Sequence, residues 1–280
     1  MSSAAGVTGP SHAAVVRAAL AEDLGDRGDV TSTALIPHDL VAHGRLVSRL
    51  AGVFAGRAVG DEVIRQCGLE VLWWADDGDT LAPGGVIAEL SGAARAMLAC
   101  ERTLLNLVSH LSGVATLTRA YVEVCGPCAV LDTRKTTAGL RALEKAAVIA
   151  GGGSNHRFGL FDRVLVKDNH LALAGAGLVE AVQRVRTRWP ELLVEVEAED
   201  LAGVRLGLEA GADWILLDNM SPDQMRAAVA EINGRARTEG SGRMNLERAA
   251  AAAACGVDAI SVGALTHSAP TLDIGLDLEA

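Results

Sequence analysis

Aromatic residues and positive charge are both scarce in this chain of 280 residues. Phe, Trp and Tyr together make up 3% of the residues, and 35 acidic residues outnumber 25 Lys and Arg, for a formal net charge of −10. A nucleic-acid-binding protein needs a basic surface and usually carries aromatic side chains on which bases stack. The composition therefore argues against nucleic acid as a partner.

Long apolar runs are also lacking. No stretch of 18 or more apolar residues occurs, and a membrane-spanning helix requires such a run. The first 23 residues show no basic segment followed by an apolar one, as a signal peptide would. We therefore expect a cytoplasmic protein without a membrane partner. With 50% hydrophobic residues, the chain is too apolar for general disorder, and its length favours two domains.

Cysteine is rare and odd in number, with five residues, which does not suggest a secreted disulfide scaffold. Cys125 and Cys128 have the spacing of a thioredoxin-type redox pair, but such a pair opens a helix that follows a strand. Here a helical pattern precedes the pair and an apolar strand follows it. Gly126 and Pro127 are therefore predicted to end a helix in a plain turn. No second Cys or His pair stands at zinc-ligand spacing.

Lysine occurs only three times, at Lys135, Lys145 and Lys167, and every other Lys-or-Arg position is Arg. Lysine differs from arginine because burial can shift the pKa of its compact ammonium group. Lys145 lies in a predicted helix, where chance is the simplest explanation. The motifs around Lys135 and Lys167 favour a function for these two.

The N-terminal part has the pattern of one α/β unit. Ser11–Asp23 shows helical periodicity, and Arg45–Phe54 and Leu69–Trp74 are predicted as strands with a helix near Asp61–Cys67 between them. A long helix is predicted from about Ala93 to Ser112, where apolar residues recur at helical spacing.

From about residue 115, short β-branched runs alternate with helical patterns. The runs are Ala129–Arg134, Arg163–Asp168, Leu192–Ala198, Trp214–Asn219, Ala236–Gly242 and Ala259–Ala264. Such alternation favours parallel βα units. A complete eight-stranded barrel needs roughly 250 residues, so we predict an α/β fold with an incomplete (β/α) barrel of six or seven parallel strands. An open doubly wound sheet is the alternative.

Charged residues follow the first two strands of this part, where either fold binds its ligands. Arg134 and Lys135 are adjacent cations after the first strand, and Lys167 follows the second. Between them lies a glycine-rich loop that closes in His156 and Arg157. Such loops bring backbone N–H groups close to phosphates or carboxylates, although the glycines alone would equally suit a flexible connector.

Carboxylates and small residues follow the later strands. Glu195 and Glu197 alternate by two, so both point to one face, which is the interior of a barrel. Glu197 and Asp218 could hold Mg²⁺ or sugar hydroxyls, or could be salt-bridged core acids. Turns at 241–242 and 262–264 suit the close approach of a phosphate. Together these strand ends predict a site for a polyanion with a metal-bound sugar on an otherwise acidic protein.

Six ordered motifs resemble the quinolinate phosphoribosyltransferase family over nearly the whole chain. They are Asp-Thr-Arg-Lys-Thr, Gly-Gly-Gly-x-Asn-His-Arg, Lys-Asp-Asn-His, Val-Glu-Val-Glu, Leu-Leu-Asp-Asn and Val-Gly-Ala-Leu-Thr-His-Ser. The resemblance implies a Mg²⁺-dependent transferase of NAD biosynthesis. Such an enzyme converts quinolinate and phosphoribosyl pyrophosphate into nicotinate mononucleotide, pyrophosphate and CO₂. It also implies an N-terminal α/β sandwich domain (1–114), an incomplete barrel (115–280) with its last residues packed back on the first domain, and a homodimer.

The resemblance also implies a role for individual residues. The quinolinate site would be lined by Arg134, His156, Arg157 and Lys167, with Arg102 entering from the neighbouring subunit. The phosphoribosyl substrate would be handled by Lys135, Glu197 and Asp218, of which Glu197 and Asp218 would hold Mg²⁺ directly or through water. The catalytic residues would be Lys135, Lys167, Glu197 and Asp218. Further substrate contacts would come from Thr133, Ser241, Gly242, Val262, Gly263 and Ala264.

One turn departs from the family's pattern, and three other functions stay open. The family usually has two glycines after the serine, whereas Arg243 follows Gly242 here and could pair with phosphate directly. Lys167 could instead form the Schiff base of a barrel lyase. A related protein could act on another base such as nicotinate or assist molybdenum transport, although a cation-rich site favours the dicarboxylate. A non-catalytic anion-binding module is the third alternative.

Overall fold

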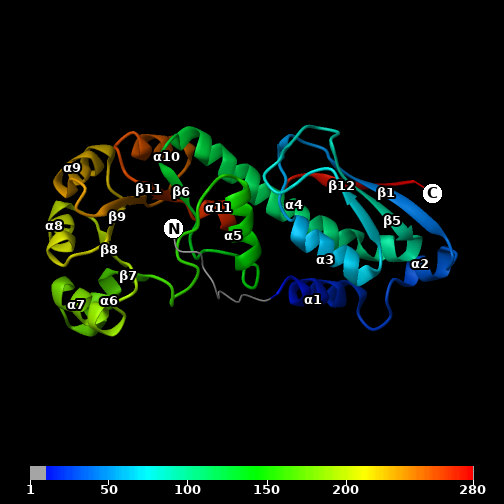
Figure 1. Cartoon of the computed structure of the whole chain (residues 1–280), viewed down its shortest axis with the longest axis horizontal. Coiled ribbons are helices and arrows are strands. Elements are labelled where there is room, and N and C mark those ends of the chain that lie inside the picture. The colour runs from blue at the N-terminus through cyan, green and yellow to red at the C-terminus, as the bar shows by residue number, and fades with distance from the viewer. Residues whose placement is uncertain (1–10, 280) are drawn as a thin grey trace. The chain divides into compact units, whose positions relative to one another are not determined.

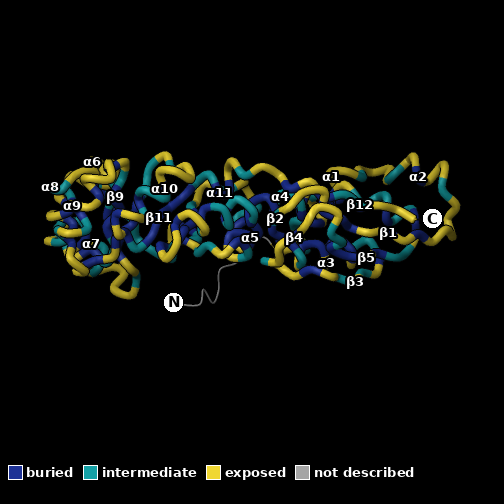
Figure 2. The backbone as a smooth tube through the Cα atoms, turned by 90° about the horizontal axis from the view of Figure 1, so that it is seen from above, coloured by how far each residue is buried: buried dark blue, intermediate teal, exposed yellow. Residues whose placement is uncertain are grey.

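The structure is a computed structural model that describes residues 11–279. These residues divide into two units (Figure 1). The first comprises residues 11–119, 136–152 and 265–279, and the second comprises residues 120–135 and 153–264. Each unit has a sheet of its own, and Figure 2 shows buried residues inside each unit and exposed residues along the loops.

The first unit contains a four-stranded antiparallel sheet in the order β12-β1-β5-β3. Its strands are β1 Val41–Ser48, β3 Glu70–Trp73, β5 Val86–Ala93 and β12 Ile274–Glu279. Two short strands, β2 Gly52–Val53 and β4 Thr80–Leu81, pair with each other in a separate small sheet. The last strand, β12, pairs along β1 from His43 opposite Glu279 to Ser48 opposite Ile274. Residues from both ends of the described chain therefore build this sheet.

The helices of this unit are α1 His12–Leu24, α2 Val30–Leu35, α3 Arg57–Cys67, α4 Ala94–Cys125, α5 Arg141–Ala150 and α11 Ala264–His267. Both α4 and α11 include residues that belong to the second unit. The strand predicted over Arg45–Phe54 is interrupted. β1 ends at Ser48, whose hydroxyl donates to the carbonyl of Leu50 and closes a turn.

Helix α4 is longer than the sequence predicts. The expected end near Ser112 is wrong, because the helix continues to Cys125. The small and polar residues there make tertiary contacts instead of ending the helix. Ser112 Oγ accepts from Ala55 N at 3.1 Å, and a Cβ on Gly113 would lie 2.1 Å from the carbonyl oxygen of Pro270. The domain boundary predicted between residues 114 and 115 consequently falls inside this helix.

The turn after α4 is the plain turn that the sequence predicts. Gly126 adopts φ 59°, a left-handed conformation that suits glycine, and β6 begins at Ala129. Burial raises the pKa of Cys125 and, more strongly, that of Cys128 to about 12. Both thiols are therefore protonated at neutral pH and lack the thiolate that redox chemistry needs.

The second unit contains six parallel strands in the order β6-β11-β10-β9-β8-β7. They are β6 Ala129–Leu131, β7 Val164–Val166, β8 Val194–Ala198, β9 Trp214–Asp218, β10 Arg237–Ser241 and β11 Ala259–Ser261. From β7 to β11 each strand neighbours the next in sequence, without the reversal of a doubly wound sheet. Within residues 11–279, β6 and β7 do not pair, which leaves the predicted incomplete barrel.

Helices cover one face of this sheet. They are α6 Asp168–Ala174, α7 Leu178–Arg188, α8 Leu201–Glu209, α9 Pro222–Ile232 and α10 Leu246–Ala253. A Cβ on Gly207 of α8 would lie 2.8 Å from Cγ2 of Val196, so Val196 faces this helix. Its neighbours Glu195 and Glu197 point to the opposite, interior face, as predicted. No helix of the described chain is long and apolar enough to cross a membrane.

Candidate active site

The predicted site residues of the second unit lie at the carboxyl edge of the parallel sheet. Lys167 directly follows β7, and Asp218 and Ser241 are the last residues of β9 and β10. Asp218 and Ser241 also pair in register, so they stand side by side at this edge. Arg134 follows β6 by three residues. The expected placement at strand ends is thus confirmed.

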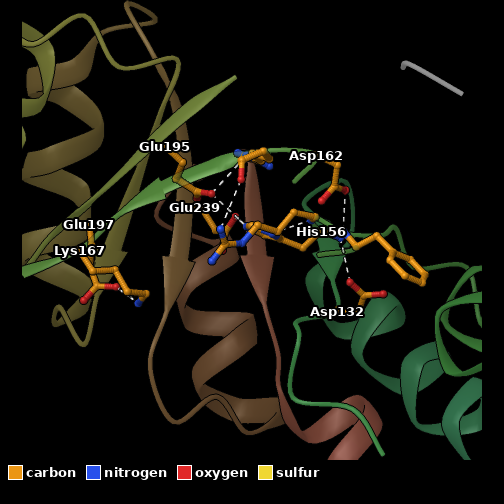
Figure 3. Close-up of polar contacts among 10 residues, drawn as sticks. Asp132, His156, Asp162, Lys167, Glu195, Glu197 and Glu239 are labelled. Atoms are coloured by element: carbon orange, nitrogen blue, oxygen red, sulfur yellow. Dashed lines mark hydrogen bonds and ion pairs between the residues drawn. The ribbon is translucent and has the colours of Figure 1, made fainter. Parts of the chain in front are cut away.

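Lys167 and Glu197 form an ion pair across two neighbouring strands (Figure 3). The side chain of Glu197 is 13% exposed and that of Lys167 is 40% exposed. The backbone N–H of Lys167 donates to Nδ1 of His170 at 3.0 Å. The Lys167 amine is thus held as a paired ammonium ion, which is a poor nucleophile for Schiff-base formation.

Arg134 and Arg157 are close enough to affect each other. Burial and the charge of Arg134 lower the pKa of the half-buried Arg157. The Nη1 atom of Arg157 donates to the carbonyl oxygen of Arg163 at 3.3 Å, which ties the guanidinium to its own loop. Two guanidinium groups held near one another attract an anion, because the anion relieves their repulsion.

The second unit also contains a buried cluster of charged side chains, with His156 beside Glu195 and Glu239 (Figure 3). The Nε2 atom of His156 lies 3.0 Å from Oε2 of Glu195 and 3.3 Å from Oε2 of Glu239, and both carboxyl groups are fully buried. Arg163 Nε lies 3.3 Å from the same Glu195 oxygen, and its guanidinium stacks over Trp214 at 4.6 Å. His156, predicted to line the quinolinate site, is itself buried in this cluster.

Sequence reasoning missed Glu239 and Arg163. Glu239 did carry a signal, because it stands inside a strand between Thr238 and Gly240, both of which are buried. A carboxyl group at such a position needs a partner. No local pattern identifies His156 as that partner, since the two residues are far apart in the chain.

The carboxyl groups of the cluster shift the pKa of His156. Burial by itself lowers the pKa, but the contacts and charges of Glu195 and Glu239 outweigh it and raise the pKa to about 9. The backbone N–H of Arg157, 2.7 Å from Nδ1, opposes this rise, because Nδ1 accepts a hydrogen bond only without a proton. The carboxyl groups carry more weight, since two buried groups act on one ring.

We expect the ring of His156 to titrate well above its ordinary pKa of 6.5, near pH 9, in the folded protein. Because the folded pKa is raised, the stability that this protonation contributes is complete below pH 6.5 and is lost as the pH rises through about 9. NMR titration of the ring, assigned by comparison with His156→Gln, measures the midpoint. A midpoint at or below 6.5 would contradict the expectation.

The glycine-rich loop serves to place His156. A Cβ on Gly151 would lie 2.4 Å from the carbonyl oxygen of Ala115, so close packing requires glycine there. Ser154 bridges Leu131 in parallel, and the buried Asp132 accepts from His156 N at 2.8 Å. These contacts fix the loop beside β6, which rules out the flexible connector.

Three carboxyl groups at the strand ends fit a cation of the magnesium type. Oxygen atoms of Glu197, Glu199 and Asp218 lie within 4.8 Å of one another. Oxygen-only ligands at a partly exposed position suit Mg²⁺, which keeps several of its waters. Glu199 was missed, although it continues the alternation that begins with Glu195.

The predicted phosphate turn after β10 has an unusual backbone conformation. Gly242 has φ 104°, and a Cβ there would lie 2.3 Å from Oδ1 of Asn219. Arg243 is exposed and adopts φ 43°, which is uncommon for a residue other than glycine. Although Arg243 stands where the family usually has glycine, the turn after β10 keeps a left-handed backbone conformation.

The remaining predicted residues make hydrogen bonds near the ends of β6 and β11 or lie in the first unit. The N–H of the buried Val262 donates to Leu131 O at 2.9 Å, and Gly263 and Ala264 follow it. The N–H of Lys135 donates to Thr133 Oγ1 at 3.0 Å. Arg102 is exposed on α4 of the first unit. It lines a depression of about 410 Å³ whose polar members include Asn106, Ser109 and Asp273.

Comparison with known proteins identifies relatives of the whole chain. The family model "Quinolinate phosphoribosyl transferase, N-terminal domain" matches residues 29–112, and the corresponding C-terminal domain matches residues 114–277. The chain is 47% identical over 272 residues to a nicotinate-nucleotide pyrophosphorylase (carboxylating) of Mycobacterium leprae (strain TN), covering 94% of this chain and 95% of that protein. A chloroplastic enzyme of the same name from Arabidopsis thaliana is 40% identical over 300 residues, with 98% and 86% covered.

Solved structures agree with this relationship. The nicotinate-nucleotide pyrophosphorylase of Francisella tularensis superposes with a TM-score of 0.90 at 35% identity and covers 96% of both chains. That of Ehrlichia chaffeensis superposes with a TM-score of 0.91 at 35% identity, with 95% of this chain and 97% of that chain covered. Sequence and fold thus agree along the full length, and the chain belongs to the quinolinate phosphoribosyltransferase family.

Proposed function

We propose that the protein transfers the phosphoribosyl group of phosphoribosyl pyrophosphate to quinolinate with decarboxylation, giving nicotinate mononucleotide, pyrophosphate and CO₂ for NAD biosynthesis. The observation that carries the proposal is that the family match spans both units and includes the carboxyl edge with its cations and carboxylates. The absence of a membrane-spanning helix among the described residues is compatible with a cytoplasmic reaction, which we include in the proposal.

Quinolinate is a planar dicarboxylate, and the cations at the edge suit it. Arg134 and Arg157 form a pair of guanidinium groups, and such groups bind carboxylates through two parallel hydrogen bonds. Lys167 adds a third cation, and His156 stands behind Arg157. The cations hold the ring so that its nitrogen faces the sugar, and this orientation lowers the barrier to transfer.

The acidic residues suit the sugar side of the reaction. The ring nitrogen attacks C1 of the ribose as the bond to pyrophosphate breaks, and positive charge develops on the sugar. Glu197 and Asp218 stabilise this charge, and Lys135 stabilises the departing pyrophosphate. The backbone turns at Ser241–Gly242 and Val262–Ala264, with Thr133, receive the phosphate groups.

Decarboxylation follows from the product of this transfer. The ring nitrogen is now cationic, so the bond to the adjacent carboxylate can break with its electron pair left on the ring carbon. CO₂ departs, and the carbon then takes a proton. The second carboxylate stays with the arginines and keeps the ring in place. The step needs no covalent bond to the protein.

Magnesium belongs to the proposal as a cofactor held by Glu197 and Asp218, directly or through water, with Glu199 within reach. When bound, Mg²⁺ supplies counter-charge for the pyrophosphate. Removal of the metal with a chelator should therefore abolish product formation, and added Mg²⁺ should restore it.

The test of the proposed function is product formation from quinolinate and phosphoribosyl pyrophosphate with Mg²⁺, followed as pyrophosphate and nicotinate mononucleotide. Nicotinate in place of quinolinate is the control, and preference for nicotinate would favour a related transferase acting on that base. Borohydride treatment with a carbonyl substrate should give no adduct on Lys167. An adduct would favour a Schiff-base lyase, and the absence of any product would favour a binding module.

We also propose a homodimer in which Arg102 of one subunit completes the site of its neighbour. Arg102→Ala and Lys135→Ala subunits should each be nearly inactive alone. A mixed dimer contains one site with both changes and one with neither, so refolding the two variants together at equal amounts should recover about one quarter of the activity. Each variant refolded alone is the control, and no recovery in the mixture would contradict the shared site.

A further inference from the structure

Burial of the charged side chains of His156, Arg163, Glu195 and Glu239 costs folding free energy. The carboxyl oxygens of Glu195 and Glu239 and two nitrogens of Arg163 are buried, and they face other charged groups of the same cluster. Buried charges without good hydrogen bonds destabilise a fold, and apolar replacements are often neutral or stabilising. A role in positioning nearby site residues would account for keeping such a cluster.

The cluster contacts Arg157 at two points. Arg157 directly follows His156 in the chain, and its backbone nitrogen lies 2.7 Å from the ring atom Nδ1. Its guanidinium donates to the carbonyl oxygen of Arg163 at 3.3 Å. A shift of the His156 ring would therefore disturb the backbone of Arg157, and a shift of the Arg163 main chain would disturb its charged end.

The two carboxyl groups hold these two contact residues. Glu195 lies within ion-pair distance of both His156 and Arg163, at 3.0 and 3.3 Å, and Glu239 lies 3.3 Å from His156. Because β8 and β10 carry the two glutamates, the sheet itself fixes where the ring can lie (Figure 3). Trp214, on the strand between them, supports Arg163 from one side.

His156, Glu195 and Glu239 also have the spacing of metal ligands. The Nε2 proton of His156 and the guanidinium of Arg163 already face the two carboxyl groups there. A divalent cation would have to displace the proton of His156 and lie beside the guanidinium of Arg163. The charges of the cluster thus favour a support for side chains over an ion site.

We propose that Glu195 and Glu239 are positioning residues for the dicarboxylate substrate, which hold Arg157 in its binding orientation through His156 and Arg163. The inference rests on the proposed function, because it takes Arg157 to bind a carboxylate of quinolinate. The glutamates themselves do not touch the substrate.

The test compares Glu239→Gln with Glu209→Gln, a change of the same kind at an exposed position on α8. Glu239→Gln should raise the KM for quinolinate about tenfold, as the loss of a supporting residue typically does, and leave the KM for phosphoribosyl pyrophosphate unchanged. Its melting temperature should fall, because removing one carboxylate leaves the buried charge of His156 less compensated, so both KM values are measured well below the unfolding transition. Glu209→Gln should change none of these values.

A double-mutant cycle shows whether Glu239 acts through Arg157. If it does, adding Glu239→Gln to Arg157→Ala should raise the quinolinate KM no further, because the arginine that it positions is gone. Independent, multiplied effects would overturn the proposal. If Glu239→Gln does not fold, Arg163→Lys, which keeps the charge but not the shape, should likewise raise only the quinolinate KM.

The remaining outcomes separate the inference from the proposed function. If the wild-type protein forms no product, the proposed function itself is contradicted. An active wild type whose Glu239→Gln variant keeps its quinolinate KM, or loses both KM values equally, would overturn only the positioning role. Zinc or magnesium bound by the wild type and lost in this variant would also overturn it, in favour of an ion site.

Discussion

Arg134→Ala should lower kcat/KM for quinolinate by about 100-fold, the equivalent of roughly 3 kcal/mol, mainly through KM. The charge of Arg134 lowers the pKa of Arg157, and the proposed function assigns both guanidinium groups to one carboxylate-binding site. Removing one of them leaves a substrate carboxylate facing a single arginine. Steady-state kinetics with quinolinate varied at saturating phosphoribosyl pyrophosphate would measure the loss.

The matched control is Arg188→Ala. Arg188 is the last residue of α7 and its guanidinium lies 5.4 Å from the ring of Trp189. A helix that returns from the carboxyl edge ends at the opposite edge of a parallel sheet, so this change should leave the kinetics unaltered. Equal kinetic parameters for the Arg134 and Arg188 variants would remove Arg134 from the site.

Asp218→Asn should lower kcat by about 100- to 1000-fold, because a group that stabilises developing charge is worth roughly 3–4 kcal/mol in the transition state. The quinolinate KM should change little, since Asp218 lies at the end of β9 with the acidic residues and not with the arginines. The separation of kcat from KM distinguishes this residue from Arg134. Single-turnover measurement of nicotinate mononucleotide would report the chemical step directly.

Two further measurements complete the test of Asp218. Asp223→Asn is the control, because Asp223 is highly exposed and its ion pair with Arg226 contributes little. A titration with Mg²⁺ then separates two roles. If saturating Mg²⁺ fully restores the kcat of Asp218→Asn, the residue only holds metal and does not stabilise charge on the sugar. An unchanged kcat at ordinary Mg²⁺ would exclude both roles.

Local patterns were enough to predict the barrel strands and the residues at their carboxyl edge. Each βα repeat shows its strand as a short apolar run, and the polar residue after it marks the carboxyl end, as Lys167 and Asp218 do. The alternation of Glu195 and Glu197 placed both on the interior face, because strand side chains alternate with a period of two. These features depend on neighbouring residues alone.

Features that depend on distant residues were predicted less well. The apparent end of α4 near Ser112 is a set of contacts with Ala55 and Pro270, which are separated from it by more than fifty residues. The two discontinuous units likewise arise from residues that are far apart in the chain. A small or polar residue that permits close packing looks, in sequence, like one that ends an element.

The sequence alone was therefore sufficient for the family, the βα repeats and the residue types at the strand ends, because each is encoded in short runs. The grouping of His156, Arg163 and Glu239 around Glu195 was not predictable in this way. It arises because the curved sheet brings β8, β10 and the loop after α5 to one interior face. The curvature of the sheet determines which buried charges pair, and the spacing of residues along the chain does not predict these pairs.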